Sequence, residues 1–216
     1  MNKKLTLVIG DKHLSSWSMR PWLLMKASGL PFKEIGILLD KPDSAEQIKK
    51  HSPSGKVPLL TIGTTKIWDS LAISETIAEL APDKNLWPTD LVARAKARSY
   101  CAEMHSSFQN LRTDLSMNLQ LKTRVNHLTA GTKADIKRVM KLWEDALAES
   151  GGPYLFGKHF GIVDAFYAPV VFRFKSYGIG IKTTAAQNYI KTISGNAHVK
   201  EWVNAALRED PTLVTF

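Results

Sequence analysis

The feature that most constrains this chain is a serine-rich turn that joins an apolar run to a helix-forming run. Residues 5–9 are apolar enough for a buried strand, and residues 22–27 suit a helix. Pro21 lacks a backbone N–H and is tolerated only in the first turn of a helix, so we expect that helix to begin near Ser16 to Ser18. Its free N–H groups and the positive end of its dipole would lie beside a cluster of hydroxyls. Such a turn can hold an anion or stabilise a thiolate.

The alternation of strand and helix continues over the first 80 or so residues. Residues 32–38 predict a second strand, which should run parallel to the first because a helix joins them. Residues 44–50 predict a short polar helix, and residues 57–62 and 66–68 predict an antiparallel hairpin. With a further helix after the hairpin, the order is βαβ–α–ββ–α. This order predicts a small α/β sandwich.

Local features mark the ends of the later elements in this part. Pro58 opens the third strand, where a proline loses no ladder hydrogen bond, and the peptide bond before it is a candidate for the cis form. Asp69 and Ser70 are suited to cap the helix that follows and ends before Pro82. The apolar face of that helix is expected to carry Ile73, Ile77 and Leu80.

From residue 91 onward the pattern is helical, with no strand-like run of useful length. Thr132 and Asp135 have the spacing of a capping box, and Pro169 should kink the helix that contains it. The predicted helices are one long helix over residues 91–111, one from Thr132 to residue 149, one beginning at residues 161–164, and a last one over about 196–208.

Two prolines, Pro82 and Pro88, lie where the character of the chain changes. A chain of 216 residues is long enough for two domains that each bury a core. We therefore predict an α/β domain over residues 1–81, a linker over 82–90 and an all-helical domain over 91–216.

Composition excludes several classes of protein. The net charge is +9, but the basic residues are scattered and not interleaved with aromatic residues, which argues against nucleic-acid binding. The single cysteine, Cys101, excludes an internal disulfide and is expected to be a buried thiol in a helix. The first apolar run is shorter than the roughly seven to fifteen residues of a signal peptide or the about twenty of a membrane span. We therefore expect a cytoplasmic protein that does not bind membranes.

Three motifs resemble those of the cytosolic glutathione transferases, and together they cover essentially the whole chain. Ser15-Ser16-Trp17-Ser18-Met19-Arg20 resembles the SSCSxR signature of the zeta class, which includes maleylacetoacetate isomerase. Residues 56–60 and 69–73 resemble the V-P-x-L and [EQD]-S-x-A-I pair that binds glutathione. Phe156-Gly157 with residues 161–164 resembles the motif that begins the sixth helix of the family.

The resemblance implies a thioredoxin-like N-terminal domain, an all-helical C-terminal domain, glutathione as co-substrate and a homodimer. Two departures from the family pattern are visible. Trp17 stands where zeta enzymes have a cysteine, which puts a zeta-specific activity in doubt. Gly161 replaces the usual serine or threonine at the start of the sixth helix, which should weaken its cap by only a few tenths of a kcal/mol.

The resemblance also implies a role for each residue of the glutathione-binding pair. Asp69 would accept the γ-glutamyl ammonium, and Ser70 at a helix N-terminus would hold the adjacent carboxylate. Val57, placed before Pro58, would pair its backbone with the cysteinyl part of the peptide, as an added strand does. Plain helix capping is the alternative for Asp69 and Ser70.

The thiol of glutathione would lie over the serine turn. A free thiol has a pKa near 8.5, and a donated hydroxyl, a helix N-terminus and the nearby Arg20 would each favour the thiolate. We expect Ser15 to supply the hydroxyl, with Ser16 as the second choice and Ser18 as an ordinary N-cap. A buried or surface ion pair is an alternative role for Arg20.

The acceptor substrate is expected between the domains, beside Trp17. His105, Gln109 and Arg112 have the spacing of one stripe on the long helix, which the resemblance places at the mouth of the site. Arg112 and Arg173 could bind a substrate carboxylate, with solvated surface charges as the alternative. The remaining histidines show no metal-ligand spacing, so no metal is predicted.

Three functions stay open from the sequence. The first is a glutathione transferase that adds the thiolate to a small electrophile. The second is a glutathione-dependent cis–trans isomerase of the maleylacetoacetate type. The third is a non-catalytic binding protein for glutathione or hydrophobic ligands, against which the complete set of Ser15, Val57-Pro58 and Asp69-Ser70 argues. Disulfide exchange of the glutaredoxin kind is disfavoured, because the turn has no cysteine.

Overall fold

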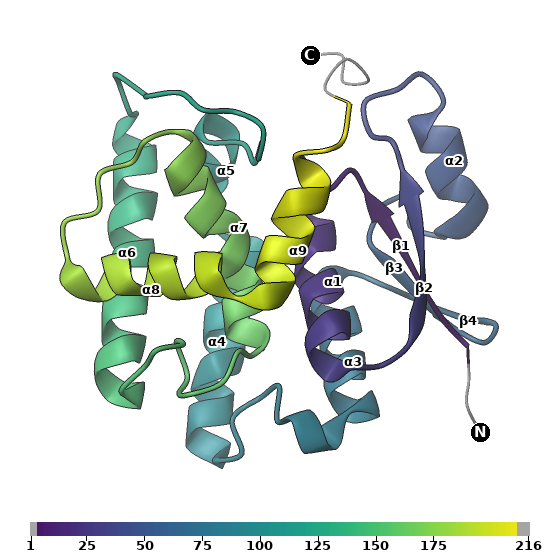
Figure 1. Cartoon of the computed structure of the whole chain (residues 1–216), viewed down its shortest axis with the longest axis horizontal. Coiled ribbons are helices and arrows are strands. Elements are labelled where there is room, and N and C mark those ends of the chain that lie inside the picture. Colours follow the sequence, from purple (N-terminus) through teal and green to yellow (C-terminus); the bar gives the residue numbers. More distant parts are fainter. Residues whose placement is uncertain (1–3, 211–216) are drawn as a thin grey trace.

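A four-stranded sheet with the strand order β2-β1-β3-β4 forms one side of the molecule (Figure 1). The structure is a computed structural model that describes residues 4–210. Strand β1 (Leu5–Gly10) pairs in parallel with β2 (Phe32–Ile37) and antiparallel with β3 (Leu59–Ile62). Strand β3 forms the hairpin with β4 (Thr65–Trp68). The parallel first pair and the hairpin are confirmed. The third strand begins two residues later than predicted, which leaves Val57 and the cis Val57–Pro58 bond just outside the sheet.

Helices cover both faces of this sheet. Helices α1 (Ser16–Ser28) and α3 (Ser70–Leu80) lie on the face toward the helical domain, and α2 (Ser44–His51) lies on the other face (Figure 1). Ile48 of α2 packs with Val8 and Leu59 of the sheet in a small separate core. Because α1 is enclosed between the sheet and the helical domain, nearly all of its side chains are buried.

A short 3-10 helix (Pro82–Lys84) leads into the helical domain. Its central helix is α7, in which all but one of the side chains are buried, and which contacts α1, α4 and α8. One continuous hydrophobic core therefore joins the two domains. The helices of this domain are α4 (Leu91–Ser106), α5 (Gln109–Asp114), α6 (Ala130–Ser150), α7 (Ile162–Ser176), α8 (Thr184–Gly195) and α9 (Ala197–Ala206).

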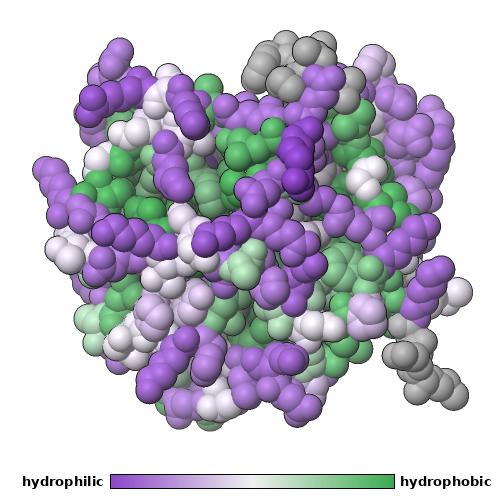
Figure 2. Space-filling model, viewed as in Figure 1, coloured by the Kyte–Doolittle hydropathy of each residue, from purple (hydrophilic) through white to green (hydrophobic). Residues whose placement is uncertain are grey.

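The surface of the protein carries both hydrophilic and apolar residues. Figure 2 shows hydrophilic residues over most of the visible face, with smaller apolar areas between them. Cys101 is buried in α4, as predicted, and burial raises the pKa of its thiol well above the usual value. Within residues 4–210, no helix is both long enough and apolar enough to cross a membrane.

The predicted single helix over residues 91–111 is wrong. Helix α4 ends at Ser106, and Phe108 adopts a left-handed conformation with φ 64° before α5 begins at Gln109. Phe108 and Leu111 are both buried in the core, so tertiary packing overrides the helix propensity of this stretch. The break also means that His105, Gln109 and Arg112 do not share one helical stripe.

Two further predicted details differ. Helix α6 begins at Ala130 and is capped by Thr129, whose Oγ1 accepts the N–H of Thr132 at 3.2 Å, so Thr132 is not the cap. Asp135 accepts the N–H of Leu111 in α5 at 2.9 Å and does not close a capping box. Leu80, at the end of α3, is exposed although it was expected on the buried face.

The start of α7 explains why glycine stands at position 161. A Cβ atom at Gly161 would lie 2.9 Å from the carbonyl oxygen of Leu86, too close without a shift of the backbone. The cap is supplied by Asp164 instead. Its Oδ2 accepts the N–H of Gly161 at 2.9 Å, and its Oδ1 accepts the N–H of Leu155 at 3.0 Å and the hydroxyl of Tyr189 at 3.1 Å.

Replacing Asp164 with Ala is expected to lower the free energy of unfolding by about 2–4 kcal/mol, because a buried cap is lost and its donors keep no acceptor. Burial raises the pKa of Asp164 from 3.8 to about 6 in the folded protein. The folded state therefore binds more protons between these values, and this group's contribution to stability is greatest below about pH 4 and falls as pH rises through 6.

Urea unfolding between pH 4 and 7 measures both effects of this substitution. The difference between wild type and Asp164→Ala should widen as the pH falls. Asp145→Ala, which removes a surface carboxylate paired with Lys141, is the control and should change stability by less than about 0.5 kcal/mol. An Asp164→Ala protein as stable as this control would contradict the capping role.

Candidate glutathione site

The serines of the first turn occupy three different positions at the N-terminus of α1. Ser15 is the N-cap, and its Oγ accepts the N–H of Ser18 at 3.3 Å. Ser15 Oγ also donates to Ser18 Oγ at 2.8 Å, and Ser18 Oγ accepts the N–H of Gly10 at 3.1 Å. The prediction that Ser18 is the cap is therefore wrong: Ser18 lies in the first turn and ties the helix to the end of β1.

A cavity of about 650 Å³ lies beside this turn. Four residues of the predicted glutathione-binding set, Val57, Pro58, Asp69 and Ser70, line it together. Its other lining residues are Trp17, Ser54, Lys56, Trp68 and His105. Ser15 and Ser16 are buried and do not line the cavity, whereas Trp17, the next residue along the chain, does.

The carboxylate of Asp69 faces the helical domain. Asp69 caps α3, where its Oδ1 accepts the N–H of Leu71 at 2.7 Å, and its backbone has a positive φ of 75°. Such a conformation is costly for a residue other than glycine and is concentrated at functional positions. His105 of α4 places its Nε2 2.7 and 2.9 Å from the two carboxylate oxygens. His105 also packs edge-on against the Trp17 ring, so these three residues meet across the domain boundary.

Arg20 is fully buried near this cavity without a carboxylate partner. Its Nη1 donates to Ser70 Oγ at 3.3 Å, while its Nε and Nη2 have no hydrogen-bond partner among the described residues. Its guanidinium carbon lies 4.2 Å from the centre of the Trp17 ring and 4.6 Å from that of Phe166. Burial, followed by the nearby charge of Arg112, lowers the pKa of Arg20 from its usual high value to about 9.

Arg112 and Arg173 are not solvated surface charges. The guanidinium carbon of Arg112 lies 4.8 Å from the Trp17 ring centre, and its Nε donates to the carbonyl of Ser107 at 3.1 Å. Arg173 is buried, and its Nη1 donates to the carbonyl of Leu115 at 2.6 Å and to that of Arg112 at 3.3 Å. Its Nη2 donates to Ser16 Oγ at 3.1 Å. Burial, followed by the charge of Arg112, lowers the pKa of Arg173 to about 10.

Gln109 is not brought to the site. It is exposed at the first residue of α5 and does not line the cavity, because the break at Phe108 turns it away from the direction of α4. Lys56 and Trp68, by contrast, line the cavity although no role was predicted for them. Each directly precedes a predicted site residue, Val57 or Asp69, and this is the sequence feature from which their place in the cavity could have been predicted.

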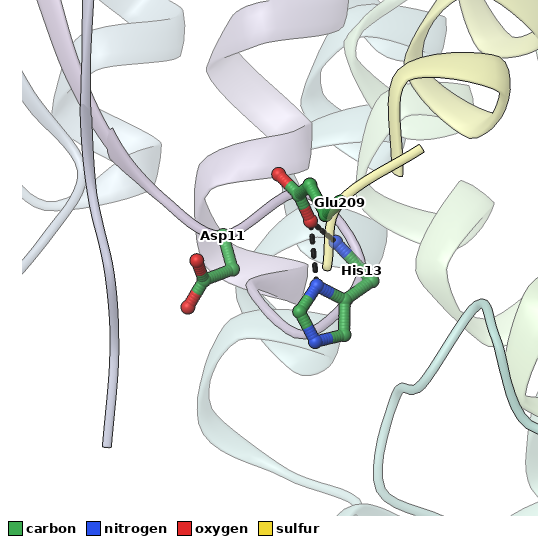
Figure 3. Close-up of side chains that lie close together, drawn as sticks. All are labelled: Asp11, His13 and Glu209. Atoms are coloured by element: carbon green, nitrogen blue, oxygen red, sulfur yellow. Dashed lines mark hydrogen bonds and ion pairs between the residues drawn. The ribbon is translucent and has the colours of Figure 1, made fainter. Parts of the chain in front are cut away.

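The loop that leads into α1 is held by Glu209, which follows α9. Glu209 accepts the N–H groups of Lys12 and His13 at 2.8 and 2.9 Å, and its Oε2 lies 2.5 Å from His13 Nδ1. Figure 3 shows Glu209 and His13 pointing toward one another, with Asp11 beside them directed toward the neighbouring backbone. There Asp11 accepts the N–H of Leu39 at 2.7 Å. These contacts anchor the serine turn to the helical domain, a position for His13 that no sequence spacing predicted.

A second cavity, of about 560 Å³, lies in the helical domain between α6 and residues 178–183. It contains none of the predicted site residues. The cavity at Trp17 is therefore the candidate site.

Comparison with known proteins decides the family. The N-terminal domain of glutathione S-transferases matches residues 14–80, and the C-terminal domain of the same family matches residues 126–205. Glutathione S-transferase 1 of Dianthus caryophyllus is 30% identical over 160 residues, which cover 73% of this chain and 72% of that protein. The chain belongs to the glutathione S-transferase family.

Relatives within the family include zeta-class proteins. A probable maleylacetoacetate isomerase of Caenorhabditis elegans is 26% identical over 194 residues, covering 88% of this chain and 87% of the relative. Glutathione S-transferase Z1 of Arabidopsis thaliana is 30% identical over 161 residues, covering 73% and 72%. These relatives confirm the zeta-like resemblance.

The fold agrees with solved structures of the family. A glutathione transferase homolog from Burkholderia, solved with bound glutathione, superimposes with a TM-score of 0.70 at 21% identity and covers 94% of this chain and 98% of that one. The thioredoxin-like domain followed by a helical domain is therefore confirmed as a glutathione transferase architecture.

Proposed function

We propose that this glutathione S-transferase family member binds glutathione in the cavity at Trp17 and transfers its thiolate to a small electrophile, working as a homodimer. The observation that carries the proposal is the cavity itself, which brings Val57, Asp69 and Ser70 together beside the N-terminus of α1. Cavities of a few hundred Å³ with a few convergent polar groups are typical of small-molecule sites.

The polar groups at the cavity provide partners for most of those of glutathione. The peptide has an ammonium, two carboxylates and a thiol. Asp69 is the carboxylate that lines the cavity and is the partner we assign to the ammonium. Ser70 offers its hydroxyl and the N-terminus of α3 to the neighbouring carboxylate. The backbone N–H and C=O of Val57 bond to no residue within 4–210, so they are open to the cysteinyl part of the peptide.

The chemistry follows from the position of the thiol. A serine hydroxyl and the N-terminus of α1 stabilise the thiolate, which is the nucleophilic form of the sulfur. The thiol proton leaves to solvent. The sulfur then forms a bond with the electrophilic carbon of the acceptor, and the displaced group departs with the bonding electrons. Trp17 and His105 lie where this acceptor would bind, between the two domains.

Isomerisation of a maleyl substrate is the second candidate. It is favoured by the isomerase names of several relatives and by Arg20 and Arg112, two cations that both contact the Trp17 ring. In this reaction the thiolate adds to a conjugated double bond, the new single bond rotates, and elimination releases glutathione unchanged. Trp17 fills the position of the zeta-class cysteine, so we rank transfer first.

Incubating the purified protein with glutathione and a panel of small electrophiles tests the proposal. Mass spectrometry should find a conjugate with at least one acceptor. Conversion of a maleyl substrate without consumption of glutathione would favour the isomerase instead. Glutathione binding without turnover of any acceptor would indicate a binding protein, and failure to bind glutathione would contradict the proposal.

Replacing His105 with Ala is expected to tighten glutathione binding about threefold, because the ammonium no longer competes with the imidazole for Asp69. Titration calorimetry at pH 7 measures the change. His159→Ala, at an exposed histidine outside the cavity, is the matched control and should bind as the wild type does. Weaker binding by the His105 variant would show that this histidine orients Asp69 for the ligand.

A further inference from the structure

The cavity of about 560 Å³ in the helical domain combines apolar side chains with lysines. It lies between α6 and the connection from α7 to α8, and it shares no lining residue with the cavity at Trp17. Its volume is typical of a small-molecule site. Six apolar residues line it, and each is only partly buried while packing against the hydrophobic core: Val125, Leu128, Ile136, Met140, Ile179 and Ile181. The fold therefore leaves part of this apolar surface uncovered.

Hydrogen bonds fix the two segments that close this cavity against α6. The N–H of Thr123, in the segment before α6, donates to the carbonyl of Ser176 at the end of α7 at 2.8 Å. Thr183, in the segment before α8, donates its hydroxyl to the carboxylate of Glu144 on α6 at 2.8 Å. Both segments are thus attached to a helix. A ligand that enters this cavity does not have to order its walls, which removes one of the costs of binding.

Three lysines line the cavity against a single carboxylate, that of Glu144. They are Lys133 and Lys137 of α6 and Lys182 of the segment before α8. All three are exposed, and within residues 4–210 none of them forms an ion pair. The charge at the edge of the apolar surface is therefore positive, and it is complementary to an anion.

The positions of these lysines do not stabilise the helices on which they lie. Lys133 is at the end of the first turn of α6, and Lys182 directly precedes the N-cap of α8. The positive end of a helix dipole disfavours a cation at such positions. Lys133 and Lys137 are four residues apart on one face of α6, where like charges repel. An anion bound between them would offset both costs.

The residues of α6 arrange charge and apolar surface along one direction. Lys133, Lys137 and Met140 have the spacing of one helical stripe, and Met140 lies roughly 10 Å along the helix from Lys133 at about 1.5 Å per residue. A neighbouring cavity of about 460 Å³ shares Ile179 and Ile181 with the first one, so the apolar surface continues beyond it. A positive end followed by a long apolar surface is complementary to a single-chain amphiphile with an anionic head.

We propose that this second cavity binds a free fatty carboxylate, with the carboxylate between Lys133 and Lys137 and the alkyl chain over Met140, Ile179 and Ile181. The inference goes beyond the proposed function and does not depend on it. No covalent bond forms or breaks. The carboxylate satisfies the unpaired charge, and the chain covers the exposed sides of the apolar residues, which gives the favourable part of the binding free energy.

Titration calorimetry with decanoate tests this proposal, with the cavity at Trp17 saturated by S-hexylglutathione. Decanoate should still bind under these conditions, and binding should weaken as the salt concentration rises. Replacing both Lys133 and Lys137 with Gln is expected to weaken decanoate binding about tenfold, because two ion pairs are lost. Decanol, which has the same chain and no charge, should bind the wild type and this variant equally.

Met140→Trp tests the apolar part of the site, since the larger side chain fills the space that the alkyl chain would occupy. It should weaken decanoate and decanol by at least about tenfold each. Lys66→Gln with Lys200→Gln, two exposed lysines that line neither cavity, is the control for the loss of charge and should bind decanoate as the wild type does. Circular dichroism confirms that each variant is folded.

Three results would overturn the proposal: complete displacement of decanoate by S-hexylglutathione, unchanged binding in Met140→Trp, or equal losses in the two lysine double variants. The first result would assign decanoate to the cavity at Trp17. A wild type that binds decanoate but not S-hexylglutathione would contradict the proposed function, and the losses in Met140→Trp and in the Lys133 and Lys137 variant would then support this second site.

Discussion

Replacing Asp69 with Asn is expected to weaken glutathione binding about thirtyfold, because the ammonium loses a charge-assisted hydrogen bond worth about 2 kcal/mol. Apart from the lost charge, asparagine should preserve the structural roles of Asp69. Asparagine caps helices as well as aspartate does, so the bond from the N–H of Leu71 can be kept. Asparagine also tolerates the positive φ of 75° at this position better than other residues do.

Two controls separate the charge of Asp69 from its place in the fold. The melting temperature of Asp69→Asn should stay close to that of the wild type, since the cap and the backbone conformation are preserved. N-acetylglutathione, which has no ammonium, should bind wild type and variant equally weakly in titration calorimetry. If the variant lost affinity for both ligands to the same extent, Asp69 would not be the partner of the ammonium.

Replacing Arg20 with Met is expected to change stability and binding in opposite directions. Arg20 is fully buried, has no carboxylate partner, and leaves Nε and Nη2 without acceptors. An apolar side chain of similar length removes this desolvation cost, so the free energy of unfolding should rise by about 1–3 kcal/mol. Glutathione binding should fall at least about tenfold, because Ser70 loses the cation that donates to its hydroxyl.

The pH dependence gives a further test of the same residue. Because the pKa of Arg20 is lowered to about 9 in the folded protein, the unfolded chain binds its proton more tightly above about pH 9. The free energy of unfolding that is lost by burying this charge is therefore constant below about pH 9 and becomes smaller above it. Arg98→Met, at an exposed arginine paired with Glu75, is the control for both measurements. A strong loss of stability in Arg20→Met would show that the buried guanidinium supports the fold.

Arg20 and Arg173 have the same relation to the site. Each is a buried arginine that donates to a serine at the start of a helix, Arg20 to Ser70 on α3 and Arg173 to Ser16 on α1. In both pairs the serine hydroxyl accepts from the cation. Because Ser70 lines the cavity and Ser16 does not, we expect the γ-glutamyl carboxylate of glutathione to be held by a serine backed by buried charge.

Local signals in the sequence were sufficient for much of the first domain. The apolar runs and the capping pair Asp69-Ser70 act over a few residues each, so the strands, the hairpin and α3 were predicted close to their observed bounds. The helical domain was predicted less well. The break at Phe108 and the cap of α6 at Thr129 depend on packing between helices distant in the sequence, which periodicity does not report.

Sequence alone was sufficient for the fold class, for the order of the elements in the first domain, and for the chemical types present at the site: serines at one helix start and an Asp-Ser pair at another. The hydrogen-bond partners and burial of these side chains could not be predicted, because they arise from contacts between segments far apart in the chain. Arg173 lies 157 residues from Ser16, yet their bond is what distinguishes Ser16 from Ser15. His105 likewise reaches Asp69 from the other domain.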